Sequence, residues 1–247
     1  MRLLFIRHGD PDYVHDTLTE KGHREAALLA ERAADLNLGK CYVSPLGRAQ
    51  ATAGYSMKKL GSTAGTLEWL KEFPARIDLN KAPELLEAFP NAKMESGRYV
   101  PNIVWDIVPS YWGEHSECMD PVRWRECDIC RNSDTVEIYD YVTGKFDRLL
   151  AEHGYIRSGR CYHVEKESKE TLTFFCHFGI TCVFLAYLWG VSPFLLWHSF
   201  ALAPTSVIEV VTEERQQGTA CFRGLKIGDV SHLVIGEEPV STAARFC

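Results

Sequence analysis

Two arginines and two histidines of this sequence have the side chains that chemistry on a phosphate ester needs: Arg7, His8, Arg48 and His177. A guanidinium group stays charged near neutral pH and presents a planar fork of donors that matches phosphate oxygens. A neutral imidazole can attack phosphorus to form a covalent phosphohistidine, while a second imidazole donates a hydrogen bond to the phosphoryl oxygens. A carboxylic acid would then protonate the leaving group. Two fixed cations can stabilise the charge of the transition state, so this set of residues predicts a reaction that requires no metal ion.

Strand-like and helix-like stretches alternate along the chain and predict the elements that position these side chains. Runs of consecutive apolar residues predict buried strands at 3–6, 41–44 and 171–176. Apolar residues at helical spacing predict helices at 23–38, 48–60, 139–153 and 180–189. Two further β-prone runs predict strands at 207–212 and 220–225. This alternation predicts a three-layer α/β/α fold with a mostly parallel central sheet.

All four side chains fall at or just beyond the carboxyl end of a predicted strand. Arg7 and His8 follow the first strand, Arg48 comes soon after the second, and His177 follows the third. The carboxyl ends of parallel strands meet at one edge of a sheet, and open α/β sheets bind their ligands there. We therefore expect the four side chains to converge on one site.

The stretch from about residue 78 to residue 140 interrupts this alternation. It contains several prolines, dense acidic and aromatic residues, and three of the six tryptophans, namely Trp105, Trp112 and Trp124. We interpret residues 1–247 as a single α/β domain with a helical or irregular cap inserted at about 78–140. The tryptophans are expected to pack in this insertion.

Four stretches resemble, in this order, the sequence pattern of the histidine phosphatase superfamily: "LLFIRHGDPDY", "LTEKGHREA", "YVSPLGRAQATA" and "TLTFFCHFGIT". That superfamily is phosphoglycerate mutase-like and includes cofactor-dependent phosphoglycerate mutases, α-ribazole phosphatases and many broad phosphatases. The resemblance runs from Arg2 to about Val211 and weakens through the insertion. It implies the superfamily's α/β fold and a reaction that passes through a phosphohistidine.

The resemblance implies three catalytic residues. His8 would be the nucleophile, His177 would lie beside the phosphoryl group, and Glu72 would be the proton donor. Glu72 matches the family's Leu-x-Glu stretch as part of Leu70-Lys71-Glu72, although the glycine that usually follows is missing. Three nearby carboxylates remain alternatives for the acid: Glu68, Glu84 and Glu87.

The resemblance also implies the residues that bind the phosphate. Arg7 and Arg48 would clamp its oxygens, and Gly9 and Gly179 would let the backbone approach it closely, since glycine has no Cβ. The family's polar phosphate-contacting asparagine is absent from "DPDYVHD", the stretch after Gly9. That stretch has no assigned role from the sequence.

The resemblance favours the phosphatase branch over the mutases. "GLKIGDVSHL", residues 224–233, is similar to the tail of phosphatase members, and the long motif with which mutases hold a phosphoglycerate is not recognisable. The expected function is a metal-independent, histidine acid-type phosphatase that hydrolyses a small phosphorylated metabolite. Two alternatives remain open: a phosphoglycerate-type phosphomutase, and a non-catalytic phosphate-binding module.

Composition excludes several other classes of protein. With 46% hydrophobic and 24% charged residues, the chain is typical of globular proteins rather than of disordered or fibrous ones. The formal net charge of −6 and the absence of a clustered basic stretch give no reason to expect a nucleic-acid partner. The expected partner is a small phosphorylated substrate.

We expect a cytoplasmic protein without a membrane span. Residues 178–203 contain no Asp, Glu, Lys or Arg, but Gly190, Ser192 and Pro193 divide them into two halves with the length of buried helices. Nine cysteines, an odd number, are scattered among apolar residues, as in proteins that keep their thiols reduced. The apolar run at 3–6 is too short for a signal peptide.

A structural zinc site is a further possibility within the insertion. His115-x-x-Cys118 and Cys127-x-x-Cys130 have the spacing of two ligand pairs. The alternative is that these four residues are incidental polar and small apolar side chains of the insertion. The expected reaction itself requires no cofactor.

Overall fold

The computed structural model describes residues 1–199 and 201–241, and these residues form two compact units. The first unit comprises Met1–Glu72, Asp147–Thr181 and the described residues from Ala201 onward. The second comprises Phe73–Phe146 and the described residues from Cys182 to Ser199. The predicted insertion at 78–140 lies within the second unit.

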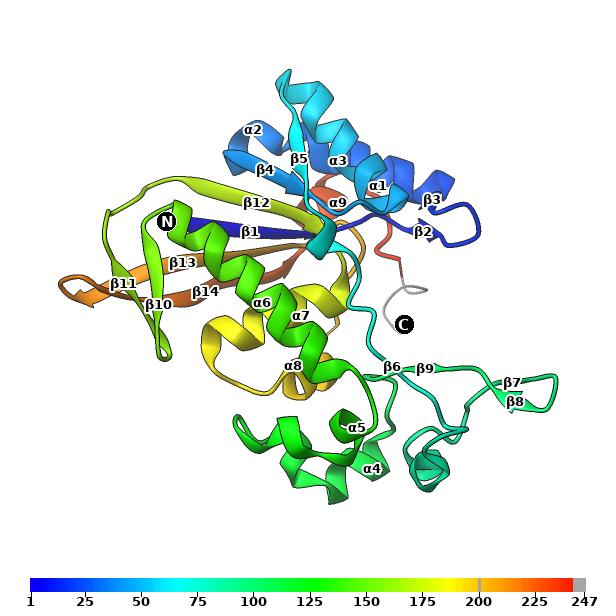
Figure 1. Ribbon diagram of the computed structural model, residues 1–247. Coiled ribbons are helices and arrows are strands. Elements are labelled where there is room, and N and C mark those ends of the chain that lie inside the picture. The colour runs from blue at the N-terminus through cyan, green and yellow to red at the C-terminus, as the bar shows by residue number, and fades with distance from the viewer. Residues whose placement is uncertain (200, 242–247) are drawn as a thin grey trace. The chain divides into compact units, whose positions relative to one another are not determined.

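An eight-stranded mixed sheet forms the centre of the first unit (Figure 1). In spatial order its strands are β10 (Tyr155–Ser158), β11 (Cys161–Val164), β14 (Thr219–Asp229), β13 (Val207–Gln216), β1 (Arg2–Arg7), β12 (Thr171–Cys176), β4 (Lys40–Val43) and β5 (Ala64–Thr66). The neighbouring strands β1, β12, β4 and β5 pair in parallel. On the other side of β1, the strands β13, β14, β11 and β10 continue the sheet in antiparallel pairing. The predicted α/β fold with a parallel centre, flanked by helices, is therefore confirmed.

The register of the three central strands aligns the residues that follow them. Arg7 of β1 lies opposite Cys176 of β12, and Phe175 of β12 lies opposite Val43 of β4. The next residues along these strands, His8, Ser44 and His177, therefore emerge at the same edge of the sheet. The strands are apolar because they are buried on both faces, and the four residues of β1 from 3 to 6 are at most 1% exposed.

Four helices of the first unit are α1 (Glu20–Glu31), α2 (Ala33–Leu36), α3 (Gly47–Leu60) and α9 (Ser231–Ile235). The sequence also offers the Thr19 hydroxyl as the cap of the helix predicted at 23–38, and this is confirmed: the hydroxyl accepts the Gly22 N–H, and α1 starts at Glu20. The predicted helix is divided at Arg32. Apolar residues of α1, α2 and α3 pack against the sheet in one buried cluster that includes Leu29, Ala33, Leu36, Ala49, Ala53, Met57, Leu4, Ile6, Val43 and Phe175.

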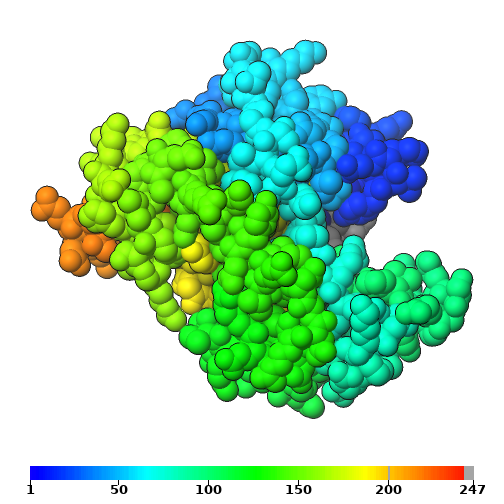
Figure 2. All heavy atoms as spheres, viewed as in Figure 1, coloured from blue at the N-terminus to red at the C-terminus, as the bar shows by residue number. Residues whose placement is uncertain are grey.

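Three pairs of strands among the described residues of the first unit are antiparallel hairpins. β2 (Pro11–Asp12) and β3 (Thr17–Leu18) form a hairpin between β1 and α1. The long β13–β14 hairpin extends both predicted strands, because pairing continues to Gln216 and Thr219, and its end is orange at the surface in Figure 2. β10 and β11 were not expected from the sequence; their residues alternate in burial, as in strands near the edge of a sheet.

Residues 178–199 form two helices, as predicted from the break in this apolar stretch. They are α7 (Phe178–Trp189) and α8 (Pro193–Ser199), separated at Gly190, which has a φ of +66°. α6 (Thr135–Glu152) starts before the predicted residue 139, since the Asp134 carbonyl already accepts the Ile138 N–H. No helix among the described residues is long and apolar enough to cross a membrane.

The second unit is built from short elements around aromatic side chains. These elements are β6 (Arg76–Ile77), β7 (Met94–Glu95), β8 (Arg98–Tyr99), β9 (Asn102–Ile103), α4 (Pro109–Glu114), α5 (Asp128–Arg131) and the 3₁₀ helices η2 (Pro83–Ala88), η3 (Ser116–Met119) and η4 (Arg123–Glu126). The Trp105 ring lies 5.3 Å from the Trp197 ring, and Trp105 and Trp124 are buried. These tryptophans therefore pack inside the unit.

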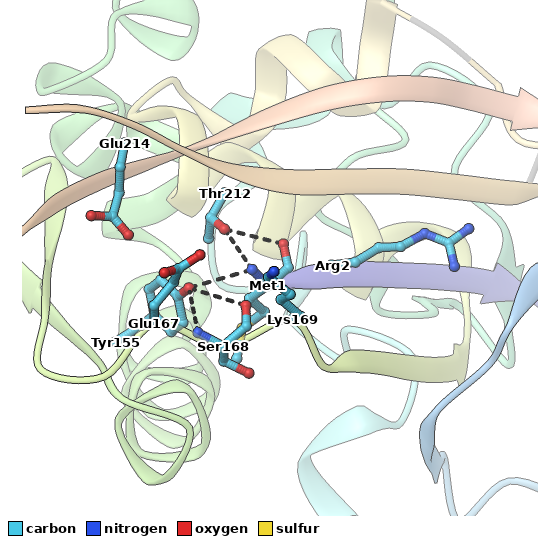
Figure 3. A pocket seen from close by; sticks show the side chains of 8 residues that line it. All are labelled: Met1, Arg2, Tyr155, Glu167, Ser168, Lys169, Thr212 and Glu214. Carbon is cyan, nitrogen blue, oxygen red and sulfur yellow. Dashed lines mark hydrogen bonds between the residues drawn. The ribbon is translucent and has the colours of Figure 1, made fainter.

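A polar pocket of about 300 Å³ lies at the amino end of β1 (Figure 3). Figure 3 shows the Met1 amino group pointing to the side chains of Thr212 and Tyr155, at 2.6 Å and 3.3 Å. Arg7 and His8 lie at the opposite end of the same strand. This pocket is therefore separate from the side chains that the sequence singled out.

Two glycines of the first unit should respond in opposite ways to replacement by alanine. Gly39 has a φ of +59°, and a Cβ there would lie 2.2 Å from the Thr171 carbonyl oxygen, so Gly39→Ala should lower the free energy of unfolding by at least about 1 kcal/mol. Gly54, inside α3, has open space around it, and Gly54→Ala should raise that free energy by about 0.5–1 kcal/mol. Urea unfolding of both variants measures the two effects. Equal stabilities would contradict the packing described for β4 and β12.

Candidate active site

The structure brings His8 and His177 together at the carboxyl edge of the sheet. The centroids of the two imidazole rings are 5.0 Å apart, and both side chains are at most 1% exposed. His8 follows β1 and His177 follows β12, so the parallel register of these strands positions both rings. Both belong to the first unit, as do the other five predicted site residues.

One hydrogen bond decides which nitrogen of His8 can act as a nucleophile. Nδ1 lies 2.7 Å from the carbonyl oxygen of Gly9. A carbonyl only accepts, so Nδ1 of the neutral ring carries the proton and Nε2 carries the lone pair. Burial lowers the pKa of His8 well below its ordinary value, and the positive charge of Arg7 lowers it further. The imidazole is therefore neutral near pH 7, as nucleophilic attack requires.

His177 is held by a residue that the sequence analysis did not single out. The Ser44 hydroxyl, directly after β4, lies 2.7 Å from Nε2 of His177 and accepts the Leu46 N–H. Nδ1 of His177 is buried and has no hydrogen-bond partner within residues 1–199 and 201–241. Burial lowers the pKa of His177 well below its ordinary value, with a further contribution from His8. A neutral His177 whose Nε2 accepts from Ser44 would present Nδ1–H as a donor to an anion.

Two guanidinium groups lie in the same part of the unit. Arg7 is 2% exposed, donates to the carbonyl of Leu202 and lies 5.9 Å from the Phe178 ring centre. Arg48 occupies the first turn of α3, where Nη1 donates to Asp16 at 2.6 Å. The positive charges of both arginines lower the pKa of His177 as well, so the four predicted side chains are electrostatically coupled.

Glu72 lies against the turn that starts with His177. Its Oε1 accepts the N–H of Ile180 at 3.0 Å, in the first turn of α7. The N–H groups in the first turn of a helix have no partners within the helix and are available to a side-chain oxygen. Glu68, in the 3₁₀ helix η1 (Glu68–Leu70), is exposed, whereas Glu72 is half-buried. The two remaining alternatives, Glu84 and Glu87, are exposed residues of the second unit.

The two predicted glycines have different surroundings. A Cβ on Gly9 would lie 2.7 Å from the carbonyl oxygen of Gly22, so close packing against α1 requires glycine at this position. The Gly9 N–H donates to the Thr52 hydroxyl of α3 at 3.0 Å, which ties the end of β1 to that helix. Gly179 lies in the first turn of α7.

The predicted zinc ligands lie in the second unit. The thiols of Cys118 and Cys130 hydrogen-bond to Cys127, and these bonds lower the pKa of Cys127 below its ordinary value. His115 instead places Nδ1 3.2 Å from Glu117 and stacks on Tyr111. In the described part of the chain, no group of three or more His, Cys, Asp and Glu side chains is arranged to hold a metal ion. A structural zinc ion stays a prediction from the sequence.

Replacing either buried histidine should change how stability depends on pH. An unfolded histidine takes up a proton near its ordinary pKa of 6.5, whereas folded His8 and His177 do so only at much lower pH. Unfolding is therefore favoured as the pH falls below 6.5. His177→Gln should reduce the slope of the unfolding free energy against pH by up to about 1.4 kcal/mol per unit between pH 6.5 and 5. Urea unfolding at several pH values measures this slope, and His8→Gln provides an independent repeat. A slope unchanged in both variants would show that the rings are not held neutral.

Comparisons with known proteins concern the sequence pattern of the amino-terminal part and the fold. Residues 3–96 match the family model of the histidine phosphatase superfamily (branch 1). No curated protein matches the sequence. A phosphoserine phosphatase mutant from Entamoeba histolytica, solved in complex with phosphoserine, is similar in structure, with a TM-score of 0.58 and 16% identity over 94% of this chain and 98% of that one.

Two further solved structures have the same fold. The α-ribazole phosphatase from Shigella flexneri has a TM-score of 0.54 and 18% identity, covering 93% of this chain and 97% of that one. A mycobacterial glucosyl-3-phosphoglycerate phosphatase has a TM-score of 0.56 and 15% identity, covering 92% and 98%. Residues 3–96 thus match the sequence pattern of the histidine phosphatase superfamily, and the chain has the fold of these solved phosphatases.

Proposed function

We propose that this protein is a metal-independent phosphomonoester hydrolase that acts through a phosphohistidine on His8. The observation that carries the proposal is the hydrogen bond from Nδ1 of His8 to the Gly9 carbonyl, at 2.7 Å. It leaves the Nε2 lone pair free to attack phosphorus in a buried, neutral ring. The solved structures with this fold include three phosphatases, named for phosphoserine, α-ribazole and glucosyl-3-phosphoglycerate, which supports a small phosphorylated metabolite as the substrate.

In the first step, Nε2 of His8 attacks phosphorus and the bond from phosphorus to the alcohol oxygen breaks. The imidazole becomes positively charged as the N–P bond forms, and the Gly9 carbonyl stabilises that charge through Nδ1–H. Arg7, Arg48 and the Nδ1–H of His177 stabilise the oxygens of the transferring phosphoryl group. Protonated Glu72 gives its proton to the departing alkoxide, which leaves as the alcohol.

In the second step, water hydrolyses the phosphoenzyme. Glu72, now a carboxylate, accepts a proton from the water while the water oxygen attacks phosphorus. The N–P bond breaks, its electron pair returns to Nε2 of His8, and phosphate leaves. The enzyme is then in its starting state, with His8 neutral and Glu72 protonated. The arginines supply the fixed positive charge throughout, so we assign no metal ion to either step.

Removal of the nucleophile tests the proposal. His8→Ala should lower release of phosphate from p-nitrophenyl phosphate by at least about a thousandfold, in buffer containing EDTA, because no other group replaces Nε2. His163→Ala, at an exposed position of β11, is the matched control and should keep full turnover. Turnover by His8→Ala at the wild-type rate would contradict the mechanism.

The proton donor can be tested by comparing two leaving groups. An alkoxide needs a proton to leave, whereas p-nitrophenolate is stable as an anion. Glu72→Gln should slow hydrolysis of glycerol 2-phosphate by about 10²- to 10⁴-fold, while the first-turnover burst of p-nitrophenol from p-nitrophenyl phosphate keeps its rate. Glu68→Gln is the control, since this nearby carboxylate is exposed. If Glu68→Gln shows the leaving-group dependence and Glu72→Gln does not, the acid has been assigned to the wrong residue.

A further inference from the structure

The hairpin between β1 and α1 contacts Arg48 through the carboxylate of Asp16 and the ring of Tyr13. Asp16 lies just before β3, with a φ of +47°, and both of its side-chain oxygens are used. Oδ2 accepts the N–H of Gly47 at 2.7 Å, and Oδ1 accepts Nη1 of Arg48 at 2.6 Å. One side chain therefore binds both the first backbone N–H of α3 and the guanidinium group of its second residue.

We propose that Asp16 is a positioning residue that orients Arg48 toward the phosphoryl group. This inference rests on the proposed function, because it assigns the direction in which Arg48 acts on the substrate. With Nη1 bound by Asp16, Arg48 retains the donor Nε, which is buried and has no hydrogen-bond partner among the described residues. That donor is available for an oxygen of the substrate.

The hairpin packs closely against α3 at Asp16, so the contact involves the backbone as well as the side chain. A Cβ on Gly47 would lie 2.0 Å from the Asp16 carbonyl oxygen, so only glycine allows this approach. The Tyr13 ring covers the guanidinium group, with its centre 5.3 Å from the central carbon of Arg48. Arg48 is thus held by the carboxylate at one nitrogen and by an aromatic ring over its plane.

Hydrogen bonds within the hairpin keep Asp16 in place. Oδ1 of Asp12 accepts the N–H groups of Val14 and His15, at 3.0 Å and 3.2 Å. The Thr19 hydroxyl, which caps α1, donates to Asp10 at 2.8 Å. Hydrogen bonds therefore fix both the loop of the hairpin and its base, and the stretch "DPDYVHD" has a structural role in aiming Arg48.

The carboxylate of Asp16 would repel a bound phosphate, but its exposure to solvent keeps this repulsion small. The Asp16 side chain is 43% exposed, so its repulsion of a bound phosphate is screened, whereas the Arg48 side chain is 11% exposed.

Without its partner Asp16, the side chain of Arg48 would sample many rotamers. Orientation matters most in the transition state, so loss of Asp16 should lower kcat without raising KM.

The test compares Asp16→Asn with Asp12→Asn. Asn in either position preserves the side-chain size, and at position 12 it also preserves the oxygen that accepts the backbone N–H groups. The first measurement is the rate at which phenylglyoxal modifies Arg48, followed by peptide mass spectrometry with exposed Arg215 as internal reference. Asp16→Asn should raise this rate about tenfold, because a charge-assisted hydrogen bond no longer holds the guanidinium group. Asp12→Asn should leave it unchanged.

The second measurement is turnover of p-nitrophenyl phosphate, with active sites counted from the burst of p-nitrophenol. For Asp16→Asn, kcat per active site should fall about tenfold without a rise in KM, and Asp16→Glu should recover part of the loss. Gly47→Ala leaves every functional group present, but it displaces the hairpin and should expose Arg48 to phenylglyoxal in the same way. This variant replaces Asp16→Asn in the phenylglyoxal measurement if Asp16→Asn fails to fold.

An Arg48 modification rate in Asp16→Asn equal to that of the wild type would overturn the positioning role, as would a full kcat in that variant. Arg48 modification does not depend on turnover. The wild-type protein could release no phosphate while Arg48 still reacts faster in Asp16→Asn than in the wild type. That result would contradict the proposed hydrolysis and support the contact between Asp16 and Arg48.

Discussion

The parallel pairing of β1 with β12 is the constraint on which the candidate site depends. Because Arg7 lies opposite Cys176, His8 and His177 leave the sheet side by side, and their rings meet at 5.0 Å. A shift of one residue in this register would turn one imidazole to the other face of the sheet. The apolar residues of β1 prevent that shift, since it would exchange the surroundings of side chains that are now at most 1% exposed.

Burial beside positive charge gives the two histidines their chemical character. Desolvation and the arginine charges both disfavour the imidazolium form, so His8 and His177 stay neutral at a pH where an exposed histidine would begin to take up a proton. The same surroundings suit a phosphate dianion, because they supply fixed positive charge and buried N–H donors. Each ring is then oriented by one neighbour, Gly9 for His8 and Ser44 for His177.

Much of the fold could be predicted from the sequence, as could the convergence of His8 and His177 at one edge of the sheet. The buried strands are recognisable in the sequence as runs of mostly apolar residues. A histidine that closely follows such a run is expected at the edge of the sheet. Ser44 and Asp16 could not be predicted as neighbours of the site, because their contacts depend on the register of β4 and on the path of a hairpin. The strands β10 and β11 were missed because each has only four residues, and because β11 joins the sheet by pairing with β14, a segment far along the chain. The Ser-Pro pair at the end of β4 was the one visible signal for Ser44.

The central claim is that Nε2 of His8 carries the phosphoryl group between the two steps. Its most direct test is to mix the protein with p-nitrophenyl phosphate, quench in alkali, where phosphohistidine survives, and digest with trypsin. Cleavage after Arg7 yields the peptide from His8 to Lys21, which also contains His15, so fragmentation must distinguish the two histidines. The account predicts phosphate on His8 alone, in an amount that falls as substrate is exhausted. Continued turnover with the phosphate on another residue, or with none trapped on His8 in the first turnover, would contradict it.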